Sequence, residues 1–182
     1  KHSIIKDKKF FNWLEKNSRL IFLKKDKELT YAIKKSCEIK IYFVTKDLNE
    51  KGLRMILNFG HTFAHAIEVR NNYSRNITHG EAVLTGMILA IKLSILKKNC
   101  TYKILNQVRN LYVKNNLTHS LKNVSNTKWI QSLIPFLKQD KKNDDDKINF
   151  LLLKNIGKAD LPNKFKISTS DLRRHCKTIS QY

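Results

Sequence analysis

Six polar side chains of the kinds that bind metals, move protons or hold anions lie within one 19-residue segment. The run EKGLRMILNFGHTFAHAIE, residues 50–68, contains Glu50, Arg54, Asn58, His61, His65 and Glu68. Wound as a single α-helix at about 100° per residue, these six side chains fall within an arc of roughly 80°. A stripe facing solvent is normally filled by lysine and glutamate, so a stripe of arginine, asparagine and histidine indicates the wall of a polar cleft.

Three histidines in and after this segment suggest a metal site. His61 and His65 stand at i and i+4, close enough on one helix face to share a ligand. For such a pair alone, two histidines bonded to neighbouring carbonyls are the better interpretation. His79, in the motif HGE at a predicted helix start, favours a metal, because a catalytic zinc takes three protein donors and keeps one position open. Glu81 is the nearest carboxylate, and it suits equally well a helix-start residue that complements the helix dipole.

The elements that would position these residues are mostly helices. Apolar residues at helical spacing predict helices around residues 4–14 and over residues 28–44, 53–69, 80–96, 102–115 and 127–138. A last helix, capped by Ser168 or Ser170, is expected to end near Ser180. Residues 148–153 form the clearest strand candidate. We therefore expect one mainly α domain over residues 1–182, with at most one or two short strands.

The composition of the chain argues against several classes of protein. The chain has 182 residues, 41% of them hydrophobic, and a formal charge of +21 that alone would suggest a nucleic-acid partner. Its lysines are scattered and form no stripe, so we do not expect nucleic acid to be the partner. No apolar run approaches the roughly 20 residues of a membrane span, which favours a cytoplasmic protein without a membrane partner. Cys37, Cys100 and Cys176 form no CxxC pair and suggest neither a disulfide framework nor a thiolate zinc site.

Four motifs in order along the chain resemble those of 3-dehydroquinate synthases. They are KHSIIKDKKFFNWLEKN from Lys1, LNFGHTFAHAIE, HGEAVLTGM from His79, and DKKNDDDKINFLLLKNIGKA near the end. The resemblance covers the whole chain and implies the helical, metal-binding C-terminal part of such an enzyme. The chain starts with Lys1 instead of Met, and we expect it to be a fragment without the family's N-terminal dinucleotide-binding domain. Ala64 departs from the family pattern, which usually has glycine there, and is expected to tighten the packing between helices.

The resemblance also implies roles for individual residues. His61 and His79 would be two of three metal ligands, and the third would be a glutamate three positions before the lysine matched by Lys1. Glu50 and His65 would be the catalytic acid–base groups. The substrate's carboxylate, hydroxyls or phosphate would be bound by Lys1, Lys40, Arg54, Asn58 and one or both of Lys141 and Lys142. No residue of this chain would bind the NAD cofactor, because the sequence has no glycine-rich strand–turn–helix unit.

The implied activity is a phosphate-eliminating carbon–oxygen lyase of the shikimate route. It converts 3-deoxy-arabino-heptulosonate 7-phosphate, a phosphorylated sugar acid, to 3-dehydroquinate, with NAD and a divalent metal, zinc or cobalt. We expect the full-length protein to be a homodimer. The isolated fragment is expected to bind metal weakly and to turn over no substrate. One alternative is the C-terminal domain of a metal-dependent polyol or alcohol dehydrogenase. Two others are a non-catalytic basic module that binds nucleic acid, and a decaying remnant that retains its site residues.

Overall fold

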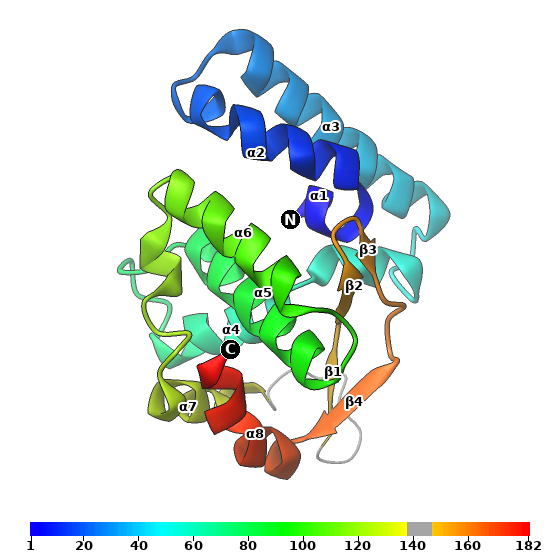
Figure 1. Ribbon diagram of the computed structural model, residues 1–182. Coiled ribbons are helices and arrows are strands. Elements are labelled where there is room, and N and C mark those ends of the chain that lie inside the picture. The colour runs from blue at the N-terminus through cyan, green and yellow to red at the C-terminus, as the bar shows by residue number, and fades with distance from the viewer. Residues whose placement is uncertain (138–146) are drawn as a thin grey trace.

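The computed structural model describes residues 1–137 and 147–182, and Figure 1 shows its helices in successive layers. The first layer contains α1 (His2–Lys6), α2 (Lys8–Phe22) and α3 (Asp26–Lys46). Asp7 ends α1 and caps α2, since its side chain accepts a hydrogen bond from the Phe10 amide at 2.8 Å. In Figure 1, α2 and α3 run side by side as a hairpin, with α1 beneath them.

The middle of the molecule is built around α4 (His61–Arg70) and α5 (His79–Leu96). The other helices are α6 (Tyr102–Lys114), α7 (Thr127–Leu137) and α8 (Thr169–Gln181), and η2 (Thr118–Leu121) is a short 3-10 turn. α8 is capped by Ser168, which accepts a hydrogen bond from the Asp171 amide, so Ser168 is the correct choice of the two predicted caps. By length and composition α5 passes as a membrane span, but 67% of it is buried inside the fold, as in a core helix.

The mainly α prediction is confirmed, but the predicted number of strands was too low. The described residues form four short strands, β1 (Lys147–Phe150), β2 (Leu153–Asn155), β3 (Lys158–Ala159) and β4 (Phe165–Ser168). β1 pairs antiparallel with β4, and β2 pairs antiparallel with β3. The predicted single strand over residues 148–153 is divided between two sheets because β1 ends at Phe150 and β2 begins at Leu153. The partner strands were missed because their apolar residues are too few to form a pattern.

The predicted continuous helix over residues 53–69 was wrong. Residues Leu53–Asn58 form a 3-10 helix, η1, and the chain then turns at Gly60, whose φ of 84° lies in the left-handed region. A Cβ at Gly60 would meet the Met87 amide nitrogen at 2.8 Å, so α5 presses directly on this turn. Opposite it, a Cβ at Gly86 would lie 2.2 Å from the Gly60 carbonyl oxygen. Two glycines therefore let the start of α4 rest on the middle of α5.

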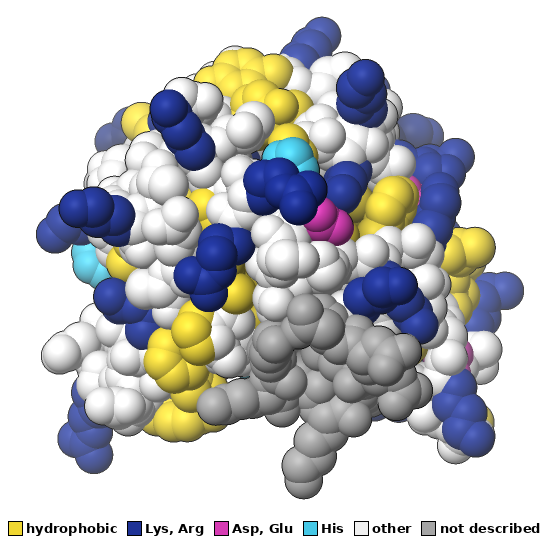
Figure 2. All heavy atoms as spheres, turned by 90° about the horizontal axis from the view of Figure 1, so that it is seen from below, with side chains coloured by type: hydrophobic (Ala, Val, Ile, Leu, Met, Phe, Trp, Pro, Cys, Tyr) yellow, Lys and Arg dark blue, Asp and Glu magenta, His cyan; other side chains and the backbone are white. Residues whose placement is uncertain are grey.

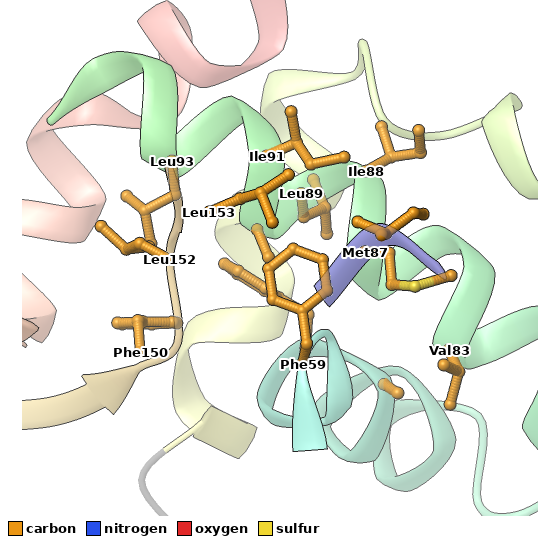
Figure 3. Packing of buried hydrophobic residues seen from close by; sticks show 14 of the residues in the cluster. Phe59, Val83, Met87, Ile88, Leu89, Ile91, Leu93, Phe150, Leu152 and Leu153 are labelled. Carbon is orange, nitrogen blue, oxygen red and sulfur yellow. The ribbon is translucent and has the colours of Figure 1, made fainter. Parts of the chain in front are cut away.

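The hydrophobic core lies on both sides of α5. Figure 3 shows Phe59 pointing from the junction of η1 and α4 into a cluster that includes Met87, Leu89 and Leu153. All four side chains are at most 1% exposed. Because Phe59 and Gly60 directly precede His61, burial of this junction fixes the place where the histidine segment begins.

Candidate active site

A loop organised by one carboxylate presents Glu50. The Asp47 side chain accepts hydrogen bonds from the backbone amides of Lys51, Gly52 and Arg54 at 3.1, 2.8 and 2.9 Å. These bonds, with that of the Arg54 amide the largest, lower the pKa of Asp47. The loop between α3 and η1 is thereby closed on itself and given a defined shape.

Glu50 stands at the tip of this loop in a conformation that few residues with a Cβ adopt. Its φ is 53°, and strained backbone of this kind tends to occur at functional sites. Oε1 accepts a hydrogen bond from the Asn58 side chain at 2.7 Å, and Oε2 lies 3.6 Å from Nε of Arg54. Arg54 also donates to the Leu48 carbonyl oxygen at 2.9 Å. Arg54 and Asn58, two residues of the predicted stripe, are thus both joined to a third, Glu50.

Beside Glu50 there is a cavity of about 350 Å³ with a cationic wall. It is lined by Lys1, His2, Lys40, Glu50, Arg54, Leu57 and Asn58. Burial, and then the neighbouring positive charge of Lys40, lower the pKa of the Lys1 side chain. A lysine whose charge is disfavoured by a neighbouring lysine, together with a guanidinium, makes a cavity suited to an anion, because an anion would relieve that repulsion.

The three histidines of the predicted metal site lie together. The ring of His61 is 5.8 Å from that of His65 and 5.5 Å from that of His79, centroid to centroid. Burial, followed by the charge of Lys1, lowers the pKa of His61 to about 4, so this imidazole is neutral at pH 7. Nδ1 of His61 lies 3.4 Å from the Phe59 carbonyl oxygen, a long contact for a hydrogen bond. A neutral ring whose second nitrogen points away from this carbonyl is suited to bind a metal.

His79 is held differently, by a carboxylate from the other helix. Nδ1 of His79, at the start of α5, lies 2.9 Å from Oε1 of Glu68 near the end of α4. Glu81 instead caps α5: Thr78 donates to Oε2 of Glu81 through both its amide and its hydroxyl, and the Glu81 amide bonds back to Thr78 Oγ1. Of the two interpretations of Glu81, the structure therefore supports the helix-start carboxylate.

The donor set fits part of a metal site. In both His61 and His79 the contact made by Nδ1 leaves Nε2 free to bind a metal, and imidazole nitrogen is a common zinc donor. Within residues 1–137 and 147–182, no group of three His, Cys, Asp or Glu side chains is arranged to hold a metal ion. This arrangement supplies two ligands and requires at least one more donor to complete a site.

The histidines and the Glu50 group lie along one surface. A hollow of about 440 Å³ is lined in part by Thr62, His65, Glu68 and His79, and another of about 480 Å³ by Glu50, Asn58 and Thr62. Thr62 borders both, so the two groups occupy neighbouring hollows along η1 and α4. Figure 2 shows a histidine, basic side chains and an acidic side chain gathered on one face, while other lysines and arginines are spread widely around them.

The structure thus brings most of the predicted site residues together. Lys1, Lys40, Glu50, Arg54 and Asn58 line one cavity, and His61, His65 and His79 lie beside one another. Lys141 and Lys142 lie outside the described residues. No role was predicted for Asp47, and Glu68 was placed on the polar stripe without a named partner. Aspartate side chains often accept hydrogen bonds from the backbone of a following turn, which is the one signal for Asp47. The partner of Glu68 comes from another helix, and no local pattern indicates it.

Comparison with known proteins identifies the family. Residues 1–143 match the family model described as 3-dehydroquinate synthase C-terminal. The chain belongs to this family. It is 40% identical over 172 residues to the 3-dehydroquinate synthase of Pelagibacter ubique, a match that covers 94% of this chain and 47% of that protein. It is 42% identical over 163 residues to the 3-dehydroquinate synthase of Endomicrobium trichonymphae, covering 87% and 42%. The chain spans about half the length of the relatives it matches.

Solved structures agree with the predicted fold of the family. A 2-epi-5-epi-valiolone synthase from Streptomyces hygroscopicus, with NAD+ and Zn2+ bound, superposes with a TM-score of 0.77. The identity is 21%, and 99% of this chain and 48% of that chain are covered, so this similarity concerns the fold alone. A 2-deoxy-scyllo-inosose synthase complexed with carbaglucose-6-phosphate, NAD+ and Co2+ gives 0.67 at 26% identity, covering 83% and 41%. Both of these structural neighbours are described with NAD+ and a divalent metal ion bound.

Proposed function

We propose that this chain is the metal- and substrate-binding part of a 3-dehydroquinate synthase. The whole enzyme would convert 3-deoxy-arabino-heptulosonate 7-phosphate to 3-dehydroquinate and phosphate, as a lyase of the shikimate pathway. The main support is the cationic cavity lined by Lys1, Lys40 and Arg54, next to the histidine cluster, in a member of this family. The substrate carries a carboxylate and a phosphate, and lysine and arginine are the residues that bind such groups.

In this proposal the chain's own residues hold the substrate and move protons. Asn58 and Arg54 fix the Glu50 carboxylate, which is then placed to exchange a proton with a substrate in the adjoining cavity. His65, exposed beside His61, is the second acid–base group. His61 and His79 would hold zinc or cobalt, with the third ligand coming from outside these residues. A divalent cation there would polarise a substrate hydroxyl and make its proton easier to remove.

NAD would be held by a part of the enzyme outside these 182 residues. The five glycines of the chain form no glycine-rich phosphate-binding motif. The curated relatives are about twice as long as the matched region, and the two neighbouring cyclases are described with NAD+ bound. We further propose that the whole enzyme is a cytoplasmic homodimer, and that residues 1–182 alone bind metal weakly and turn over no substrate.

Phosphate release tests this function. The chain alone, supplied with the heptulosonate phosphate, NAD and Zn2+ or Co2+, is expected to release none. The same chain joined behind the N-terminal half of the Pelagibacter ubique enzyme is expected to release phosphate. Sustained turnover by the chain alone would refute its inactivity. A folded joined protein that is inactive on this substrate but active on glucose 6-phosphate would refute the substrate assignment.

Two variants of the joined protein examine the cationic cavity. Arg54→Ala removes a guanidinium from the cavity wall, and we expect substrate affinity to fall by 10-fold or more, because a charged hydrogen bond contributes about 1.5–3 kcal/mol. Arg70→Ala is the matched control, since Arg70 ends α4, donates to Ser132 Oγ and does not line the cavity. Equal effects of the two substitutions would mean that the cavity does not bind the substrate.

A further inference from the structure

The contact between Glu68 and His79 joins two helices at the candidate metal site. Glu68 lies seven residues after His61, two turns along α4, and therefore on the same helix face. His79 is the first residue of α5 and reaches this face because the two helices pack together at Gly60 and Gly86. The distance between Oε1 of Glu68 and Nδ1 of His79 is 2.9 Å, that of a good hydrogen bond.

The chemistry of this pair fixes which ring nitrogen carries the proton. An ionised carboxylate only accepts hydrogen bonds, so Nδ1 of His79 must be the donor. In the neutral ring the lone pair is then on Nε2. The Glu68 side chain is 16% exposed and that of His79 is 59% exposed, so the carboxylate lies on the protein side of the ring while the ring itself reaches outward.

We infer that Glu68 is a positioning residue that holds the tautomer and orientation of His79 so that Nε2 is presented to the metal. This inference rests on the proposed function, which makes His79 a ligand. Metal-bound histidines commonly donate their other ring proton to a carboxylate or carbonyl, and loss of that partner typically weakens metal affinity by about 10- to 100-fold. His61 makes only the long contact to the Phe59 carbonyl, so Glu68 provides the stronger anchor of the two.

Three variants of the 182-residue chain test this role. Glu68→Ala removes the acceptor, and Glu68→Gln keeps a neutral acceptor for the Nδ1 proton. Glu81→Gln is the matched control: it removes a negative charge from the same helix start but retains the capping pattern, which glutamine also forms. For each protein we would measure the ring 15N shifts of His79 without metal, the affinity for Zn2+ and Co2+ by competition with a chromophoric chelator, and the urea midpoint.

We expect wild-type His79 to have its proton on Nδ1. Glu68→Ala should give a mixture of tautomers and metal affinity lower by 10- to 100-fold, Glu68→Gln should keep the tautomer and lose only a few-fold, and Glu81→Gln should match wild type. An unchanged tautomer in Glu68→Ala, or metal affinity within two-fold of wild type, would overturn the inference. A fall in the urea midpoint without these changes would show a merely structural contact and would overturn it as well.

The same measurements separate this inference from the proposed function. If His61→Ala binds Zn2+ with the same affinity as wild type, the proposed metal site is wrong. The tautomer of His79 is read without metal, so it still decides whether Glu68 controls the ring.

Discussion

Replacing Gly86 with alanine tests whether glycine packing holds the two histidine-bearing helices together. A Cβ at Gly86 would lie 2.2 Å from the Gly60 carbonyl oxygen and 3.0 Å from the Ala64 amide nitrogen. An ordinary carbon–oxygen contact is about 3.3 Å or longer, so α4 and α5 must separate by roughly 1 Å. Both atoms that would be met are backbone atoms, and no side-chain rotation can relieve the contact.

The expected cost follows from two opposing effects. Overpacking in a close-packed interior typically costs about 1–3 kcal/mol, and the rigid backbone contact places Gly86→Ala near the upper end. Alanine is favoured over glycine within a helix by about 1 kcal/mol, which offsets part of that loss. We expect the free energy of unfolding to fall by about 2 kcal/mol, which for a chain of this size lowers the melting temperature by roughly 4–8 °C.

Thermal and urea unfolding, with metal affinity as a second measurement, would check this prediction. Gly80→Ala is the control, because Gly80 lies in the same helix but a Cβ there has no neighbour within 4 Å. We expect that control to be neutral or stabilising by up to about 1 kcal/mol. Gly86→Ala should also weaken Zn2+ binding, since His61 directly follows Gly60 and would move away from His79. Equal stability of the two variants would refute the close approach of α4 and α5.

Three further outcomes are expected from single substitutions. Burial lowers the pKa of Lys92 to about 8, below its value in the unfolded chain, so the penalty for burying the charge is present below pH 8 and is lost as pH rises. Between pH 8 and 10 the free energy of unfolding of wild type should therefore rise by about 2 kcal/mol relative to that of Lys92→Met. Urea unfolding whose difference between the two proteins does not change with pH would contradict this. Asp47→Ala should weaken phosphate binding more than Asp47→Asn does in an NMR titration, because the alanine leaves three loop amides without their acceptor. Ala64→Gly should lower the free energy of unfolding by about 2 kcal/mol, through lost helix propensity and the loss of a buried methyl group; a higher urea midpoint would contradict that reasoning.

The helices were the most predictable part of the fold. α3 and α5–α7 begin and end within about two residues of their predicted limits, because their apolar residues recur at helical spacing. The segment from Leu53 to Val69 failed because Gly60 was treated as one small helical residue among others. Gly60 has a left-handed conformation and leaves no room for a Cβ beside Met87, a neighbour that helical periodicity along one segment does not reveal.

The grouping of the site residues was predicted better than the geometry that produces it. An unbroken helix was expected to align Glu50 with His65, yet the structure places Glu50 on a loop and His65 on α4. They border two hollows that share Thr62, and Asp47 folds the loop that carries Glu50 back toward η1. Glu68 belonged to the predicted stripe, but its bond to His79 depends on the crossing of α4 and α5, which motif spacing does not specify.

The exposure of the candidate site explains why its residues should bind an anion or a metal only weakly in this chain alone. The side chains of Arg54, Glu50 and His79 are 32, 36 and 59% exposed, so water competes for each charge and each donor. Two unit charges 4 Å apart interact by about 1 kcal/mol in water and about 4 kcal/mol at the effective dielectric of a protein surface. A second wall that covered these side chains would therefore strengthen their Coulomb attraction to a bound anion with no change in the residues themselves. Phosphate affinity should accordingly rise steeply when this chain is joined to a dinucleotide-binding half, and the increase should be greater for wild type than for Arg54→Ala.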